Sequence, residues 1–574
     1  MVIAPAMSPA RATEPPPVRG GSGRWQAAVA VAGGTALIAV QAARYGNWIV
    51  DDAAITFAYA RNLSDGLGPV VQPGADPVEG YSNPTWTALL ALGRLVGLFD
   101  RGTFFGIPDY VLFPKALGLL CCAGILVAFH AAAAMVVRRP WVVTLAGGAV
   151  LAAIPSFVIW AFSGLENPLY ALAVVTLAVV TFRAVLSGRL RTSRVAAATG
   201  VLAAVAALTR PEGAIYAGVY PVVVLIHLRR ANLKPSLGHA LVSVAAFAVP
   251  FGSYVLWRYL EFGRLVANTA VAKRQGLPEI GQLTRAGDLV QYAGALAVLV
   301  LVVLVGLTLA RSSWWRDGLI TLLVPLGLAL AAYAVLEPDW MAQFRFATPV
   351  WALSALIGAL AATEVFRNTR ARGRVLLCGA LVVTLVPSVA SLERANEKFQ
   401  SQPTLPMCFV ADRFGRMFNQ YADILGVREG SVLEPDLGGT SLTSRLHVVD
   451  LAGLVDDEIA DHYHDQDMAA LREHVFEEVK PTFIHFRMYW GPVTGVGSDP
   501  RLARDYVPIY TYPDAADYGG DFVRRDAVTD PGLLAAAQDY ANENVAATES
   551  KINAWGLRRC GDTLTPGQTA LGVH

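Results

Sequence analysis

Two adjacent acids, Asp51 and Asp52, follow a long apolar run and open a polar segment of the chain. A carboxylate in this position can take a proton from an attacking hydroxyl group, which is the role of a general base. It can equally accept hydrogen bonds from the free amides at the start of its own helix, which is a purely structural role. Both interpretations of the acid pair stay open at the level of sequence.

Further ionisable residues recur along the chain in short polar segments between apolar runs. The acids are Glu79, Glu166, Glu212 and Asp339, and the bases are Arg210, Lys273, Arg274 and Arg345. Arg and Lys at a membrane surface can neutralise the phosphate of a lipid whose tail lies in the bilayer. Together with a carboxylate base, they lead to the hypothesis of glycosyl transfer from a polyprenyl phosphate.

Structural alternatives remain for the basic residues. Arg210 and Glu212 could form an ion pair at a tight helical hairpin, and Lys273 with Arg274 could anchor lipid headgroups. Ionisable groups at membrane depth are costly unless they face a cavity or a partner. Their clustering on one side of the predicted membrane therefore favours a polar site.

The amino-acid composition indicates whether the chain is surrounded by water or by lipid. The chain has 574 residues, of which 54% are hydrophobic and 16% are charged, whereas a soluble protein has roughly a quarter charged. This excludes an ordinary soluble enzyme. The net charge of +1 offers no basic excess for nucleic acid. Most of the acidic residues follow Leu392, which indicates two regions in different solvents.

The first region contains about eleven apolar runs, most of them long enough to cross a hydrocarbon core of roughly 30 Å. The predicted spans are 26–43, 110–136, 141–160, 168–186, 195–209, 213–228, 237–257, 289–310, 318–336, 346–366 and 375–392. The sequence therefore predicts a polytopic α-helical membrane domain over 25–392. A separate domain follows at 393–574.

Lys and Arg are more frequent in one of the two alternating sets of connections, and this set should be cytoplasmic. The N-terminus then lies inside, and the C-terminal domain lies outside a plasma membrane. Residues 1–24 are rich in Pro and Gly and are predicted to be a disordered cytoplasmic tail. The first apolar run is interpreted as a retained signal anchor.

The first outer loop, residues 44–109, is predicted to contain an interfacial amphipathic helix that begins at Asp51. Turns lead from it to a second interfacial helix that ends near Leu98. Trp48, like Tyr81 and Trp86, has a ready explanation as an aromatic residue at the membrane interface.

Six motifs occur in order along the first region. They are Asp51–Leu63, Val78–Pro84, Ser163–Glu166, Arg210–Gly213, Asn268–Lys273 and Asp339–Phe346. Each is weak alone, but as an ordered set covering most of residues 45–350 they resemble GT-C integral-membrane glycosyltransferases. The resemblance is greatest to the terminal arabinofuranosyltransferase type of the mycobacterial cell wall.

The resemblance implies a multi-helix enzyme that uses a lipid-phosphate-linked sugar on the outer face and a cell-envelope glycan as acceptor. It implies arabinofuranose as the sugar, with mannose and galactofuranose as alternatives. Asp51 would be the essential acid, accompanied by Asp52. The other implied site residues are the cavity acids Glu79, Glu166 and Asp339, the donor-phosphate ligands Lys273, Arg345, Arg210 and Arg274, and the motif residues Arg61, Tyr81, Asn83 and Asn268.

No cofactor is assigned from the sequence. A divalent cation at the acid pair remains an alternative, because hard cations bind carboxylate oxygens. In the C-terminal domain, His447, Asp450, Asp456, Asp457, His462 and His464 match no strong ligand spacing. We interpret them as solvated acids and a histidine pair on a loop, and assign no metal.

The C-terminal region is predicted to be a small α/β domain of the extracytoplasmic side. Strands are expected in 432–440 and 446–454 around a glycine turn, then a helix over 467–479 and a strand over 482–486. Cys408 and Cys560 are its only cysteines, and an oxidising exterior would permit them to pair.

Two other classes of function compete with the enzyme. A transporter or lipid flippase would place polar residues near the midplane, in broken helices or in matched halves of the chain. A non-catalytic assembly or binding protein would tolerate the loss of Asp51. The sequence shows no internal repeat, and its acids lie at the predicted outer edge, which favours the transferase.

Overall fold

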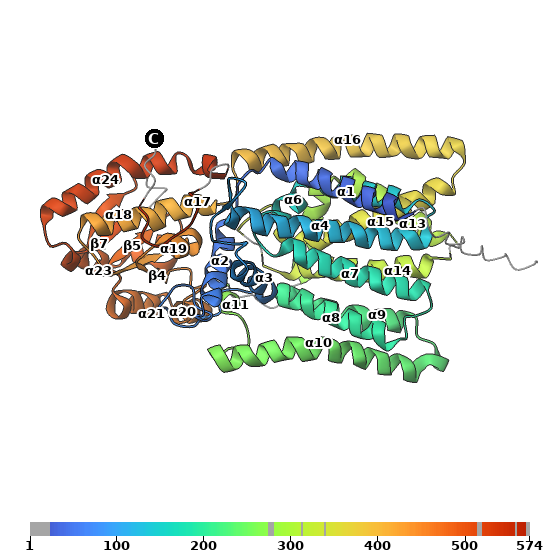
Figure 1. Cartoon of the computed structure of the whole chain (residues 1–574), viewed down its shortest axis with the longest axis horizontal. Coiled ribbons are helices and arrows are strands. Elements are labelled where there is room, and N and C mark those ends of the chain that lie inside the picture. Colours follow the sequence, from blue (N-terminus) through green and yellow to red (C-terminus); the bar gives the residue numbers. More distant parts are fainter. Residues whose placement is uncertain are drawn as a thin grey trace, which may run out of the picture.

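The computed structural model describes residues 23–273, 280–311, 314–337, 340–513, 519–556 and 560–569. The chain forms an elongated molecule, with a bundle of long helices at one end and a domain of helices and strands at the other (Figure 1). Most of the predicted disordered tail, together with the predicted site residues Arg274 and Asp339, lies outside the described residues.

The bundle contains thirteen described α-helices, several of which run nearly the full length of this part of the molecule (Figure 1). They are α1 (Gly23–Ala43), α4 (Asp109–Val136), α5 (Pro140–Ala153), α6 (Pro155–Ala161), α7 (Asn167–Leu186), α8 (Ser193–Thr209), α9 (Val219–Ile226), α10 (Leu233–Phe262), α12 (Ala286–Ala293), α13 (Ala295–Ala310), α14 (Arg316–Val335), α15 (Thr348–Arg367) and α16 (Ala371–Ser401).

Among the described residues, seven helices are long and apolar enough to cross a membrane. The number rises to nine if the bent pairs α5–α6 and α12–α13, with angles of 86° and 102°, each form one span. Ten of the eleven predicted runs coincide with helical segments to within about five residues. The last helix, α16, instead continues past the predicted end at 392 to Ser401, so the predicted boundary between the two domains falls inside it. The count of eleven spans is not confirmed, because α8 has only 17 residues and is about 26 Å long, short of a roughly 30 Å core.

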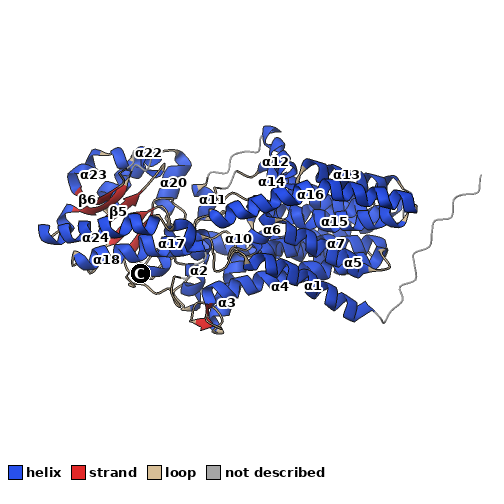
Figure 2. Ribbon diagram, turned by 90° about the horizontal axis from the view of Figure 1, so that it is seen from above, coloured by secondary structure: helices blue, strands red, loops and turns tan. Residues whose placement is uncertain are grey.

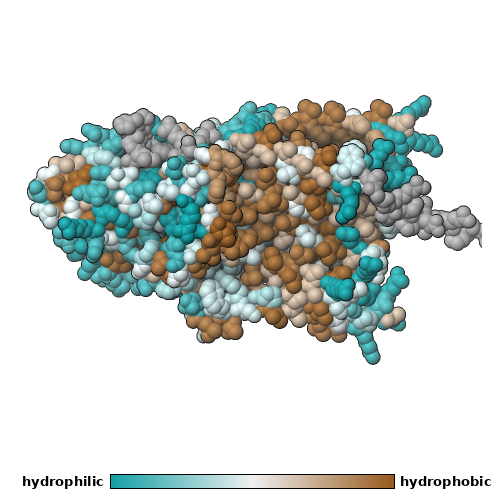
Figure 3. All heavy atoms as spheres, in the orientation of Figure 1, coloured by the Kyte–Doolittle hydropathy of each residue, from teal (hydrophilic) through white to brown (hydrophobic). Residues whose placement is uncertain are grey.

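The surface of the bundle is suited to lipid. Hydrophobic side chains cover the side of the bundle, whereas hydrophilic residues gather at its far end and on the second domain (Figure 3). Leu260, Val375 and Leu376 are more than 70% exposed. A continuous apolar surface of this kind is stable in a bilayer and not in water. The protein is therefore a multi-pass membrane protein.

The loop between α1 and α4 folds into α2 (Asp51–Ser64), α3 (Pro84–Leu95) and a small hairpin of β1 (Thr103–Phe104) and β2 (Ile107–Pro108). The expectation that α2 is an amphipathic helix with one face open is wrong. Ten of its 14 residues are buried, and it lies between the bundle and the second domain (Figure 1). A helix that is apolar on most of its faces is stable only when it is covered on most of them.

Trp48 also differs from its predicted interfacial position. It is 2% exposed, and its indole nitrogen donates to the carbonyl of Thr404 at 2.9 Å. Its ring packs edge-on against Phe399 with centroids 4.9 Å apart. Trp48 thus ties the start of the first loop to the chain that enters the second domain.

The second domain has a five-stranded mixed sheet with the order β4-β3-β5-β7-β6. The strands are β3 (Ser431–Glu434), β4 (His447–Asp450), β5 (Phe483–Phe486), β6 (Tyr506–Thr511) and β7 (Gly520–Arg524). β3 pairs in parallel with β4 and β5, and β7 is antiparallel to β5 and β6. Val432 and Leu433 belong to two different apolar clusters, so both faces of β3 are covered.

Helices cover the two faces of this sheet (Figure 2). They are α17 (Met407–Val410), α18 (Met417–Ile424), α19 (Leu437–Thr443), α20 (Asp457–Asp465), α21 (Met468–Glu473), α22 (Trp490–Thr494), α23 (Pro500–Asp505) and α24 (Pro531–Glu549). The first predicted strand is too long, because the chain leaves β3 at Glu434 and forms α19 where a glycine turn was expected. His462 and His464 lie in α20, not in a loop.

The two parts of the chain are joined by backbone and covalent contacts. The amide of Asp51 donates to the carbonyl of Leu405, and the amide of Met407 donates to the carbonyl of Ile49, both at 3.0 Å. Cys408 and Cys560 form a disulfide across 152 positions of sequence. This bond ties the end of the chain to the entrance of the second domain.

We expect reduction of this disulfide to lower the stability of the second domain by about 2–4 kcal/mol, because the unfolded chain regains the freedom that the bond removes. Thermal unfolding of wild type and a Cys408→Ser/Cys560→Ser variant measures the effect. Cys378, which is exposed and free, provides the control variant Cys378→Ser. Thiol labelling of Cys408 and Cys560 in unreduced, denatured protein would contradict the pairing.

Candidate functional site

Polar side chains from the first loop, from α10 and from connections between other bundle helices meet at the end of the bundle that faces the second domain. The segment between α2 and α3 is central to this region, since it carries Glu79 and Asn83. A short helix, α11 (Asn268–Ala272), also lies there (Figure 2). Two buried clusters of ionic and polar residues result, one containing Asn83 and the other containing Glu79.

The first cluster is built around Arg210, which is 6% exposed. Its guanidinium donates to Glu166 Oε1 at 2.5 Å and also pairs with Glu212. Asn83 Nδ2 donates to the other oxygen of Glu166 at 2.7 Å. The predicted ion pair of Arg210 with Glu212 is therefore present, but Glu166 joins it. The ring of Phe346 lies 4.7 Å from the guanidinium carbon and covers it.

The sequence around Glu166 explains how it reaches this cluster. Gly164 adopts a φ of +92°, and a Cβ there would lie 3.0 Å from Ala53. Glycine thus permits both the turn and its close approach to α2. Asn167 Nδ2 donates to the carbonyl of Arg345 at 3.0 Å. These contacts hold the Ser163–Glu166 motif against the first loop and the start of α15.

The second cluster is centred on Glu79, which is 2% exposed. The hydroxyl of Tyr254 donates to Glu79 Oε1 at 2.6 Å, and Arg258 pairs with both carboxylate oxygens. Both partners come from α10. Tyr81 packs edge-on against Tyr59 with centroids 4.9 Å apart, and burial raises the pKa of Tyr81 to about 12. Glu79 is a paired, buried carboxylate.

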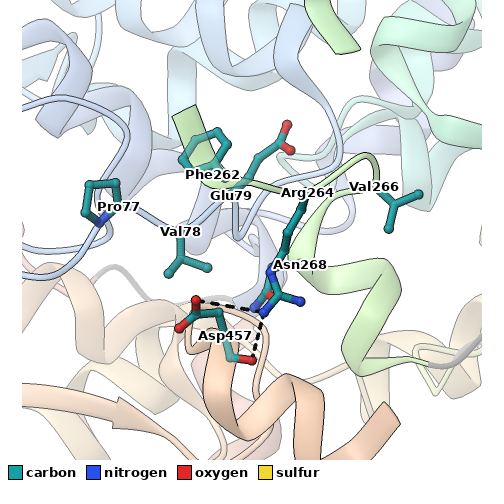
Figure 4. Close-up of a pocket in the computed structure, with 8 residues that line it drawn as sticks. All are labelled: Pro77, Val78, Glu79, Phe262, Arg264, Val266, Asn268 and Asp457. Atoms are coloured by element: carbon teal, nitrogen blue, oxygen red, sulfur yellow. Dashed lines mark hydrogen bonds and ion pairs between the residues drawn. The ribbon is translucent and has the colours of Figure 1, made fainter. Parts of the chain in front are cut away.

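A pocket of about 220 Å³, including the solvent at its mouth, opens beside the second cluster. Its lining comes from the first loop, from the region between α10 and α11, and from α20 (Figure 4). Arg264 reaches across it to the carbonyl of Asp457 at 3.2 Å. The side chain of Asn268 donates to the carbonyls of Gly453, Leu454 and Asp456. The pocket thus lies where the helix bundle meets the second domain.

Asp51 is 4% exposed. It caps α19 of the second domain, and not α2, the helix that it begins. Its two carboxylate oxygens accept from the amides of Gly438 and Gly439 at 3.0 and 2.7 Å, at the start of α19. A Cβ at Gly438 would lie 2.1 Å from the Asp51 carbonyl oxygen, so only glycine fits there. Burial and repulsion by Asp436 raise the pKa of Asp51 well above its usual value, although the two amides oppose the shift.

Asp52 has a different environment from its neighbour. It is partly exposed, and it lies one helical turn before Thr56 on the same side of α2. The Thr56 hydroxyl lies 3.3 Å from Asn83 Nδ2, which in turn binds Glu166. Of the two adjacent acids, Asp52 is therefore on the side of α2 that faces the Arg210 cluster, and Asp51 faces the second domain.

The remaining predicted residues occupy varied positions. Arg345 is buried near the first cluster, with its guanidinium 3.2 Å from Met341 Sδ and 5.0 Å from the Phe346 ring. Lys273 is exposed at the end of α11. Arg61 binds both oxygens of Asp100 and the carbonyls of Leu442 and Leu564. Arg61 is thus a link between the two parts of the chain.

Sequence reasoning missed several members of this region. Tyr254 lies within the predicted span 237–257 and Arg258 directly follows it, and neither was singled out, yet both bind Glu79. Gly438 and Gly439 were expected as a turn. An arginine within the last turns of a membrane helix was the available signal for Arg258, because a charge there requires a partner.

Comparisons with known proteins show the following. No protein-family model and no curated protein match the chain. It is similar to the archaeal oligosaccharyltransferase AglB from Archaeoglobus fulgidus in complex with an inhibitory peptide and a dolichol-phosphate, at 13% identity and a TM-score of 0.47, over 88% of this chain and 75% of that one.

Two further solved structures are similar to the chain. ArnT from Cupriavidus metallidurans bound to undecaprenyl phosphate has 14% identity and a TM-score of 0.45, over 79% of this chain and 80% of that one. The arabinosyltransferase EmbB from Mycobacterium smegmatis has 15% identity and a TM-score of 0.39, over 96% and 42%. Because each TM-score is below 0.5, we base the proposal of function on contacts within this chain.

Proposed function

We propose that the protein is a GT-C glycosyltransferase that moves a sugar from a polyprenyl phosphate to a cell-envelope glycan on the outer face of the membrane. Arabinofuranose is the sugar we propose first, on the ordered motifs of the first region. The proposal rests on the partly exposed Asp52, which helix geometry places on the same side of α2 as Thr56. Thr56 contacts Asn83, a member of the buried cluster with Glu166 and Arg210. This region lies where an apolar bundle meets a polar domain.

The proposed reaction needs a donor phosphate at the membrane surface. The polyprenyl tail would lie along the apolar bundle, and its phosphate would be bound by Lys273 and Arg345, with Arg274 as a further candidate. Arg210 already binds two carboxylates, so we assign it to positioning Glu166 and the first loop. Cationic groups at the phosphate favour departure of the polyprenyl phosphate, because they stabilise the negative charge that it gains.

The acceptor side of the reaction needs a base. Asp52 would take the proton of an acceptor hydroxyl while its oxygen bonds to the anomeric carbon of the sugar. The bond from that carbon to the phosphate oxygen breaks, and polyprenyl phosphate leaves with the electron pair. Asp51 would position its neighbour through the two amides of α19. Glu79, held by Tyr254 and Arg258, would fix the wall of the cavity.

The proposal includes an orientation and a division of the chain. The end of the bundle that carries the polar clusters would face the outside, together with the domain at 393–574, and residues 1–24 would be cytoplasmic. The transmembrane catalytic domain would span 25–392, with the first outer loop at 44–109. The outer domain would help to bind the glycan acceptor.

The decisive experiment is transfer by the purified protein in vesicles. A panel of radiolabelled polyprenyl-phosphate sugars, including arabinofuranose, mannose and galactofuranose, is offered with an envelope-glycan acceptor. We expect transfer from one donor only, and the identity of that donor names the sugar. Movement of labelled lipid across the bilayer without transfer would instead support a flippase. If the protein binds the acceptor but shows neither transfer nor lipid movement, the result would support a role in assembly.

A further inference from the structure

The outer domain brings together two histidines and a glutamate that are separated in sequence. Glu458 and His462 are four residues apart on α20 and so lie on one side of it. His474 follows α21 and begins a short π-helix, His474–Val479. One potential ligand atom of each of the three residues lies within 4.8 Å of those of the others.

The distances in this cluster are close to those of a metal site. His474 Nδ1 lies 3.2 Å from Glu458 Oε1 and 2.9 Å from Glu478 Oε2. In a tetrahedral zinc site with bonds of about 2.0–2.1 Å, neighbouring ligand atoms are about 3.3 Å apart. The ring of His462 is 5.9 Å from that of His474, measured between centroids. A small movement of the His462 side chain would bring its ring nitrogen to bonding distance from a zinc ion bound by the other ligands.

The surroundings of the two histidines favour the binding of an ion that the protein itself does not supply. His474 is 9% exposed, so its imidazole is held largely out of water. His462 Nε2 is buried and has no hydrogen-bond partner within the described part of the chain. A buried polar nitrogen without a partner is costly. A metal ion would neutralise the adjacent carboxylates and supply the missing partner.

The backbone that carries the cluster is anchored. Ile459 of α20 and Leu471 and Val475 around His474 belong to one apolar cluster with β3 and β5. Between the helices, Gln466 adopts a left-handed conformation with a φ of 61°, which turns the chain back on itself. Packing thus fixes the backbone of both helices, and only the exposed carboxylate side chains have to be ordered when a metal binds.

We propose that Glu458, His462 and His474 bind a zinc ion, with Glu478 as the fourth ligand. Two imidazoles and carboxylates suit zinc, whereas calcium and magnesium prefer oxygen ligands alone. Four protein ligands close the coordination shell, so the ion has a structural role. It would hold α20 against the π-helix His474–Val479.

Holding α20 in this way has a consequence for the pocket beside Glu79. The same helix α20 contributes Asp457 and Asp461, which pair with Arg264 at the end of α10. The turn before it supplies the carbonyls that bind Asn268. Zinc would therefore stabilise the outer wall of the pocket without taking part in proton transfer at Asp52.

The test uses full-length protein in detergent, purified without a polyhistidine tag. The protein is first treated with EDTA, and zinc is then added. Inductively coupled plasma mass spectrometry is expected to show one zinc ion per chain. Zinc is also expected to raise the melting temperature of the protein. Cobalt in its place should show the visible bands of tetrahedral coordination. Substoichiometric zinc, or octahedral cobalt bands only, would overturn the proposal.

Matched variants locate the ion. His462→Ala and Glu458→Gln are expected to weaken zinc binding by more than about tenfold, and their melting temperatures should no longer respond to zinc. His464→Ala, an exposed histidine of the same helix, should bind like wild type. Asp52→Asn should also keep the ion, which separates this site from the proposed transfer site. Equal affinity in wild type and a folded His462→Ala variant would refute the assignment.

Discussion

Asp52→Asn is expected to lower the rate of sugar transfer by about 10²–10⁴-fold, the usual contribution of a positioned general base. The amide cannot accept the proton of the acceptor hydroxyl, although it has nearly the same shape as the carboxylate. Because Asp52 is partly exposed, its replacement should leave the melting temperature close to that of wild type. Single-turnover transfer with saturating donor measures the loss directly.

Asp51→Asn is the matched control on the neighbouring residue. Both Asp51 oxygens accept from amides of α19, and an asparagine can satisfy only one of them. Its NH₂ group would then face a backbone N–H. We expect a lower melting temperature and weakened contact between the first loop and the second domain. If a folded Asp51→Asn loses transfer while Asp52→Asn stays within about threefold of wild type, the two roles are reversed.

Arg210→Gln is expected to have the largest effect on stability, because it leaves Glu166 and Glu212 buried without their cation. Loss of one partner from a buried ionic cluster typically costs about 3–5 kcal/mol. Donor-dependent transfer should fall as well, since Glu166 would no longer hold Asn83 and the first loop in place. Unfolding in detergent, followed by intrinsic fluorescence, measures the change in stability.

Two further variants test whether the loss of stability in Arg210→Gln comes from the unpaired buried carboxylates. Arg44→Gln removes a more exposed ion pair with Glu393 and should change stability by only about 0–1 kcal/mol. Adding Glu166→Gln and Glu212→Gln to Arg210→Gln should restore much of the stability, because no unpaired buried charge remains. If this triple variant is as unstable as Arg210→Gln alone, burial of unpaired carboxylates is not the cause.

Local features of the sequence were sufficient for the membrane part of the fold. A run of apolar residues long enough to cross lipid becomes a helix there, because no other segment satisfies its own backbone hydrogen bonds. For this reason all eleven runs lie in helical segments of the structure. The number of spans was less certain, since the bends within α5–α6 and α12–α13 depend on neighbouring helices.

The fold of the second domain was harder to predict from the sequence. Short strands such as β3 resemble other short apolar segments, and the helix at Leu437–Thr443 has two glycines in its first turn, which usually indicate a turn of the chain. Its start is stabilised by Asp51, which lies 387 positions earlier. A contact over such a distance leaves no local pattern, and therefore no periodicity could predict it.

The sequence by itself determined that this protein crosses a membrane and that most acids and bases of its first region lie in segments between the spans. Only the tertiary structure decided which of these charges meet. It assigned Asp51 to α19, Glu79 to Tyr254 and Arg258, and His462 to His474. The physical reason is that hydrophobic length acts along the chain, whereas pairing of buried charges depends on how distant elements pack.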